Sequence, residues 1–166
     1  YMTLNCSYAY AGSSEADITT NSYITAFLVS YITDADEEVE LWKKEYTLSE
    51  LETLNVIDVT AAGEQSIKVN FDEYTGLIAQ IEEEYNFKTN YYLMIVYTTE
   101  FDVVKGTAAQ NRVLQPYIKV HFEDLIYEVE KSPAAEADIN IVNTEVVVGE
   151  INWDLVIIGG IMFFIL

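Results

Sequence analysis

The last twelve residues, 155–166, are all apolar or glycine, and this run limits the possible folds more strongly than any other feature of the sequence. Trp153 stands just before it, where an indole ring would lie at the level of lipid headgroups. A helix that crosses a bilayer needs about 20 apolar residues, so we interpret residues 154–166 as the start of a transmembrane helix and the chain as a fragment of a longer protein. The alternative is a C-terminal core strand or short helix. The residues predicted to anchor the chain are Trp153, Leu155, Ile157, Ile158, Phe163 and Phe164.

Ahead of this run, residues 1–130 have the alternating pattern of β-strands. Apolar side chains occupy every second position over residues 2–10, and a loop is expected at 11–15. Over residues 18–32 both faces are largely apolar, which is typical of a strand buried in the middle of a sandwich. We therefore predict a mainly β fold, an antiparallel β-sandwich. Further strands are expected over residues 40–48, 56–59, 67–71, 90–103 and 114–129, with turns at 34–38, 61–64 and 105–107.

The strand expected over residues 40–48 has large apolar side chains on one face only. Trp42 and Tyr46 alternate with Lys43 and Glu45. Because successive side chains of a strand point to opposite faces, Trp42 and Tyr46 are predicted to face the core and the two charged residues to face solvent.

One segment changes from the period of a strand to that of a helix. Its apolar residues recur every three or four positions, while Glu82, Glu83 and Glu84 lie largely away from them. We predict one amphipathic helix over about residues 73–85, with Asp72 as its N-cap. The predicted apolar face consists of Tyr74, Leu77, Ile78, Ile81 and Tyr85.

Small and polar residues from Lys131 to Ala137 mark the expected end of the domain. Residues 131–153 are predicted to be a linker or tether between the domain and the membrane segment. Residues 139–148 within it are rich in β-formers, so a strand that pairs with a partner is the alternative.

The charge balance restricts the possible partners. The chain has 28 acidic and 8 basic residues and a net charge of −20. Such a surface repels phosphate backbones, so nucleic-acid binding is not expected. It suits an extracytoplasmic location, high salt or basic partners. The expected partners are the lipid bilayer and other protein subunits, and no small-molecule substrate is predicted.

The sequence contains no arrangement typical of an enzyme. His121 is the only histidine and lies among strand residues, so a structural role is favoured over catalysis. Cys6, the only cysteine, lies in an apolar strand and is interpreted as a small core residue. We found no phosphate-binding glycine motif, no dinucleotide fingerprint and no zinc motif. We therefore predict no catalytic residue, no cofactor and no metal site.

One acidic turn has a weak similarity to a calcium loop. Asp34, Asp36 and Glu38 place carboxylates at alternate positions, which can converge on a hard cation. The turn lacks the central glycine and the distal bidentate glutamate of an EF-hand. We keep these residues as weak calcium candidates and favour a solvated acidic turn.

Several segments together resemble a known protein family. They are Ser7 to Ile18, Tyr23 to Ala26 and Leu41 to Leu48, and the most specific piece is Trp42-Lys43-Lys44-Glu45-Tyr46. They are similar to an uncharacterised family of prokaryotic membrane proteins, catalogued as domain of unknown function fifty-three-zero-five. The resemblance implies a β-rich extracytoplasmic domain between an N-terminal and a C-terminal membrane helix, and therefore a missing N-terminal part of the domain. It also implies genomic association with signal peptidases and secreted fibre-forming proteins, but no catalytic residue.

These observations favour a membrane-anchored extracytoplasmic protein of a prokaryotic cell surface, with a structural or assembly role and no catalytic activity. An accessory subunit of a membrane complex, such as secretion or signal-processing machinery, is the alternative. An enzyme that uses a pair of acids is a third and weaker hypothesis.

Overall fold

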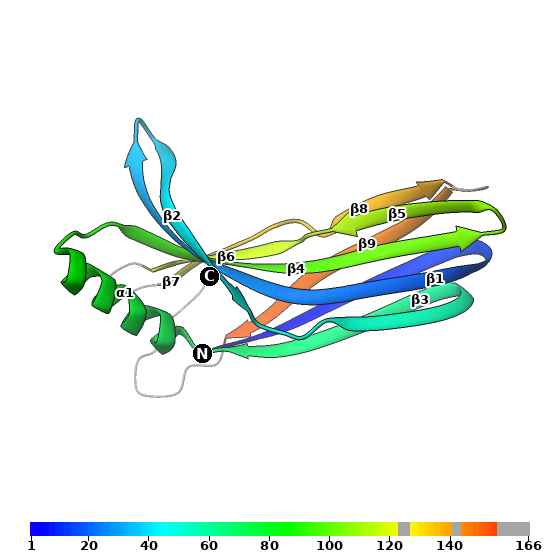
Figure 1. Ribbon diagram of the computed structural model, residues 1–166, viewed down its shortest axis with the longest axis horizontal. Helices are drawn as coiled ribbons and strands as arrows, with labels where there is room; N and C mark the ends of the chain where they lie inside the picture. The colour runs from blue at the N-terminus through cyan, green and yellow to red at the C-terminus, as the bar shows by residue number, and fades with distance from the viewer. Residues whose placement is uncertain (123–126, 141–143, 156–166) are drawn as a thin grey trace.

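The computed structural model describes residues 1–122, 127–140 and 144–155, and all structural statements below concern these residues (Figure 1). The described part is antiparallel β-structure with one helix, as the sequence predicted. The elements are β1 (Met2–Asp34), β2 (Glu37–Thr47), β3 (Glu52–Val69), α1 (Phe71–Tyr85), β4 (Asn90–Lys105), β5 (Ala108–Leu114), β6 (Tyr117–Phe122), β7 (Tyr127–Lys131), β8 (Ala135–Asn140) and β9 (Thr144–Leu155).

The strand β1 is the centre of the sheet and pairs with four other strands. Along one side it pairs with β3 over residues 2–22 and with β2 over residues 25–34. Along the other side it pairs with β9 over residues 2–11 and with β4 over residues 17–31. All strands therefore belong to one hydrogen-bonded sheet of nine strands.

This single sheet folds over itself. The hydroxyl groups of Tyr8 and Thr20 are 2.6 Å apart, although 12 residues of a straight strand would span about 40 Å. The strand β1 bends back between Ala11 and Ala16, where its register with β3 shifts. Figure 1 shows β1 and β3 curving back together at this end of the molecule. The loop predicted at residues 11–15 thus becomes the bend that turns one sheet into two layers.

The hydrophobic core fills the space between the two layers. Tyr8 from one layer meets Phe101 from the other edge-to-face, with 5.5 Å between the ring centroids. Burying apolar surface of this kind contributes about 25 cal/mol per Å². Among the largest side chains that are completely shielded from solvent are Tyr97, Met2, Leu4, Ile18, Ile24, Leu28, Leu93, Ile95 and Ile118.

The predicted turn at residues 61–64 is wrong, because these residues continue β3. Gly63 lies opposite Tyr8 in the paired strand β1. A Cβ atom on Gly63 would lie 2.5 Å from Cε1 of Tyr8, so the ring occupies the space that any larger side chain would need. The glycine that signals a turn in the sequence here makes room for an aromatic ring.

The predicted helix is confirmed, but it begins two residues earlier than expected. Asn70, and not Asp72, is the N-cap: its side chain accepts a hydrogen bond of 3.2 Å from the backbone N–H of Asp72. Phe71 and Tyr74 of the first turns are buried. The early start places Phe71 against the ring of Phe122, with 6.2 Å between centroids.

The segment expected as a linker, residues 131–153, lies largely within the sheet. It contains β8 and most of β9, which pair with each other, and β9 also pairs with β1. The β-formers in this segment therefore pair inside the domain and do not form an extended tether. In the described residues, no helix has the length and apolar content needed to cross a bilayer.

Candidate functional site

The β1–β2 hairpin and α1 border an open hollow on the surface. The hairpin turns at Ala35 and Asp36, whose φ angles of 50° and 68° match the left-handed conformation that a tight two-residue turn requires. Trp42 and Tyr46 on β2 are half-buried and face the core, as the alternation of the sequence predicted. Trp42 packs against Tyr91, and Tyr46 packs against Tyr74 of α1 with 5.5 Å between ring centroids.

Between β2 and α1 lies an open groove of about 780 Å³. This volume is in the range of 300–1,000 Å³ that is typical of ligand sites. Polar atoms enter it from Ser30, Thr89, Glu84 and the two lysines of β2, Lys43 and Lys44. Its apolar lining consists of Leu41, Trp42, Leu77, Ile81, Tyr85, Phe87 and Tyr91.

The apolar rim of the groove is unusually open to solvent. Tyr85 is 69% exposed, Phe87 is 58% exposed and Leu41 is 44% exposed. Single exposed apolar residues are normal on a protein surface, but a cluster of aromatic and aliphatic side chains around one hollow is typical of an interaction site. We therefore treat this groove, the α1–β2 groove, as the candidate binding site.

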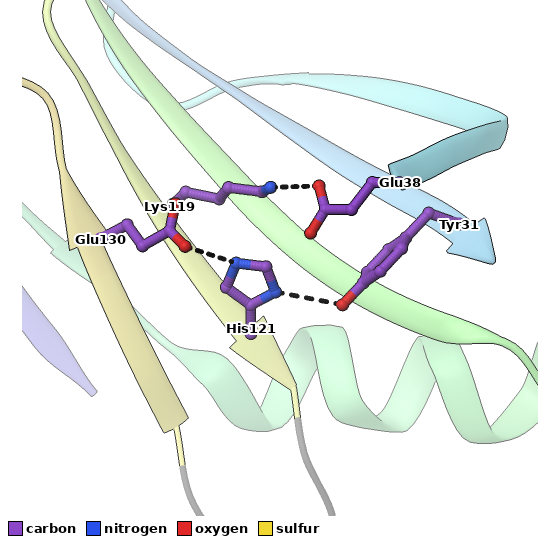
Figure 2. Close-up of polar contacts among 5 residues, drawn as sticks. All are labelled: Tyr31, Glu38, Lys119, His121 and Glu130. Carbon is purple, nitrogen blue, oxygen red and sulfur yellow. Dashed lines mark hydrogen bonds and ion pairs between the residues drawn. The ribbon is translucent and has the colours of Figure 1, made fainter. Parts of the chain in front are cut away.

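A second polar cluster surrounds the only histidine (Figure 2). The Tyr31 hydroxyl lies 3.2 Å from Nδ1 of His121, and Oε1 of Glu130 lies 3.6 Å from its Nε2. Beside them, Lys119 forms an ion pair with Glu38 at the end of β2. These residues come from β1, β2, β6 and β7, so the cluster ties four strands together across the sheet.

The charges of this cluster act on a neighbouring ring. Nζ of Lys119 lies 4.1 Å from the centroid of Tyr92, which is a cation–π contact. Burial raises the pKa of Tyr92, and the carboxylates of Glu38 and Glu40 raise it further. Tyr92 therefore keeps its proton, beside the lysine, to a higher pH than an ordinary tyrosine.

The ring of His121 is enclosed by the protein. His121 is only 6% exposed, and both ring nitrogens face groups of the protein. A general acid or base must come within hydrogen-bond distance of its substrate, directly or through one water. His121 is not among the residues that line the α1–β2 groove, so the ring and the hollow do not form one site.

The weak calcium candidates are not brought together. Asp34 and Asp36 are exposed around the hairpin turn, and Glu38 points to Lys119. In residues 1–122, 127–140 and 144–155, no three His, Cys, Asp or Glu side chains are grouped so that they could hold a metal ion. Cys6 is buried as predicted, and this burial raises the pKa of its thiol to about 12.

The predicted anchor residues divide into two groups. Trp153 and Leu155 belong to β9, where their backbones pair with Leu4 and Met2 of β1. The predicted start of a helix at residue 154 therefore differs from the structure, since β9 continues to Leu155. Ile157, Ile158, Phe163 and Phe164 lie outside the described residues.

The model of one protein family, the "Family of unknown function (DUF5305)", matches residues 42–166. The chain belongs to this family. The part of this DUF5305 member that matches begins at Trp42 and includes α1 and most of the groove lining. No curated protein and no solved structure matches the chain.

The sequence did not reveal the groove as a site, although it contained two signals for it. The predicted apolar face of the helix continued to its last residue, Tyr85, and Phe87 follows two residues later. Both side chains are exposed in the structure, so this end of the apolar face has no partner within the described residues. The pair Lys43 and Lys44, in a chain with only 8 basic residues, was the second signal.

Proposed function

We propose that this DUF5305 member is a membrane-anchored β-sandwich protein of a prokaryotic cell surface, with its folded domain outside the cytoplasm. It serves a structural or assembly role and has no catalytic activity. Lipids and other protein subunits are its partners.

The apolar run of residues 155–166 carries this proposal. The strand β9 ends at Leu155, and each residue that follows in the sequence is apolar or glycine. The sheet ahead of it is highly acidic, which suits contact with water. Residues 132–166 contain no lysine or arginine, and this agrees with an external flank under the positive-inside rule.

Fractionation of cells that express the full chain tests the anchor and its orientation. We expect the chain to stay in the membrane fraction after an alkaline carbonate wash, which removes peripheral proteins. Protease added to spheroplasts should degrade the β-domain, whereas a cytoplasmic marker should survive. Release of the chain by carbonate, or protection of the domain until the cells are lysed, would contradict the proposal.

The free edge of β3 supports an assembly role. This strand pairs with β1 along one side, and no strand pairs with its other side within the described residues. It is 18 residues long and exposes Ile57 and Val59. A long unpaired edge is a template for the addition of a strand from another chain. Electron microscopy and light scattering of the purified chain should show assemblies.

The alternative role, an accessory subunit of a membrane complex, is favoured by the charge. Two copies with a net charge of −20 each repel one another at low ionic strength. Salt screens this repulsion, since the Debye length falls to about 3 Å at 1 M. Light scattering across a salt series separates the two roles. Growth of assemblies with salt supports self-assembly, whereas a monomer at every salt concentration supports a different subunit as the partner.

A further inference from the structure

We propose that the α1–β2 groove is the surface with which the domain lies against the lipid bilayer, so that the protein contacts the membrane at a second place besides its tail. This inference rests on the proposed membrane anchor. It commits to lipid as the occupant of the groove.

The sheet register places the start of α1, the helix that borders the groove, at the end of the molecule where β9 ends. Leu155 pairs with Met2, and Met2 pairs on its other side with Val69. Adjacent strands lie about 4.8 Å apart, so Leu155 and Val69 are separated by only two strand spacings. The helix α1 begins at Phe71, two residues after Val69.

The helix then runs along the groove, whose other wall is β2. Its 15 residues span about 22 Å at a rise of 1.5 Å per residue, and the groove lies along its second half. Figure 1 shows α1 at the end of the molecule where β1 begins and β9 ends. A chain that entered a bilayer soon after Leu155 would therefore bring this end of the domain, and not the β1–β3 bend, close to the lipid surface.

The side chains at the groove are those that membrane interfaces favour. Tyr85 and Phe87 present exposed rings, and Leu41 adds an exposed aliphatic group. Aromatic residues are enriched at the headgroup level of bilayers. Amphipathic elements at membranes bury their apolar face about 5–10 Å into the boundary between headgroups and acyl chains. An open groove with a protruding aromatic rim fits this shallow insertion.

The charges at the groove also fit lipid headgroups. Lys43 and Lys44 both line it, in a chain where acidic residues outnumber basic ones by 28 to 8. The side chain of Lys44 lies along Tyr46, with Nζ 5.3 Å from the ring centroid. Lysine stems cover apolar surface while the ammonium group stays in the polar layer, where lipid phosphates lie. One carboxylate, that of Glu84, shares the lining.

The two tryptophans of the chain allow the tail and the groove to be tested separately. Trp42 lines the groove, and Trp153 lies two residues before the apolar run begins at Leu155. The full chain is reconstituted into vesicles of phosphatidylcholine and phosphatidylglycerol, with brominated phosphatidylcholine as the quencher of tryptophan emission. In Trp153→Phe the emission reports the groove, and in Trp42→Phe it reports the tail. We expect brominated lipid to reduce the emission of both variants.

The outcomes distinguish this inference from the anchor on which it rests. If lipid quenches Trp153 and leaves Trp42 unchanged, the anchor stands and the groove proposal is overturned. If it quenches Trp42 alone, the groove contacts lipid, and release of the chain by the carbonate wash then overturns the anchor. If it quenches neither tryptophan, the groove proposal is overturned.

Charge substitutions at the rim give a matched control. In the Trp153→Phe background, Tyr85→Asp together with Phe87→Asp should abolish the quenching of Trp42. Ile57→Asp in the same background should leave it unchanged, because Ile57 is 75% exposed but lies on β3, away from the groove. Equal quenching in the rim variant and in the control would overturn the proposal. Circular dichroism of each variant verifies that the sheet has formed.

Discussion

In the space between the two layers of the sheet, apolar side chains are buried against one another, whereas at the α1–β2 end several apolar side chains are exposed. Tyr8 meets Phe101 edge-to-face, forms a hydrogen bond with Thr20 and fills the space beside Gly63. At the other end, the rings of Tyr85 and Phe87 remain in solvent. The difference shows which apolar residues specify the fold and which are available for a partner.

The helix α1 itself contains both kinds of residue. Its first turns bury Phe71 and Tyr74, which contact rings of the sheet. Further along, Leu77 and Ile81 are only half-buried because the groove opens beside them. One amphipathic helix therefore buries apolar side chains at its beginning and leaves apolar side chains exposed at its end.

The largest effect is expected from Tyr8→Ala. It removes a ring from the core and leaves the Thr20 hydroxyl buried without this hydrogen bond. Replacing a large buried aromatic residue by alanine costs about 3–5 kcal/mol of unfolding free energy. Urea denaturation measures this loss. Tyr117→Ala on the exposed side of β6 is the control and should change stability by less than about 0.5 kcal/mol. Equal losses of stability in the two variants would contradict the importance of the contacts that Tyr8 makes between the two layers.

The second largest effect is expected from alkaline pH, which should lower the free energy of unfolding through the thiol of Cys6. Burial raises the pKa of its thiol from 9.0 to about 12, so above pH 9 the unfolded chain loses a proton that the folded chain keeps. The contribution of the Cys6 thiol to the free energy of unfolding is therefore fully present below pH 9 and is lost as the pH rises toward 12. One proton contributes at most about 1.4 kcal/mol per pH unit. Urea titrations at several pH values should show a steeper fall for the wild type than for Cys6→Ala; equal slopes would contradict this reasoning.

Two glycine substitutions compare the regions directly. Gly63→Ala forces a methyl group against the ring of Tyr8. This ring cannot easily move, because it forms a hydrogen bond with Thr20 and contacts Phe101. Overpacking of this kind costs about 1–3 kcal/mol. Gly76→Ala on exposed α1 meets no atom within 4 Å and should stabilise the chain by about 0.5–1 kcal/mol. The same sign for both variants in thermal or urea unfolding would contradict the contrast between the two regions.

A smaller effect is expected at the start of α1. Asn70→Ala removes the side chain that accepts from the N–H of Asp72 and donates to Glu73. Loss of such an N-cap costs about 1 kcal/mol. Hydrogen exchange should become faster in α1 and stay unchanged in β1 and β4. Glu83→Ala, an exposed position of the same helix, is the control; a uniform acceleration across the sheet would show that the cap supports the whole fold.

Much of the fold could be predicted because its signals are local. Alternation revealed the strands, and the change of period revealed α1. The turn predicted at residues 61–64 failed because the reason for Gly63 lies on another strand, at Tyr8. Residues 131–153 were predicted as a linker because pairing between β9 and β1 joins residues about 145 positions apart, which no local pattern reports. The groove was not predicted for the same reason, because its two walls, β2 and α1, are far apart in the sequence and come together only in the folded chain.

The smallest effect is expected where the structure leaves apolar side chains unused. Tyr85→Ser together with Phe87→Ser replaces two rings that are more than half exposed, so little buried area is lost on folding. Substitutions at such positions usually change stability by less than about 0.5 kcal/mol each. Urea denaturation should therefore give nearly the wild-type midpoint, in contrast to Tyr8→Ala. A loss as large as that of Tyr8→Ala would mean that these rings support the fold, and the distinction between a stabilising interior and a free binding end would no longer hold.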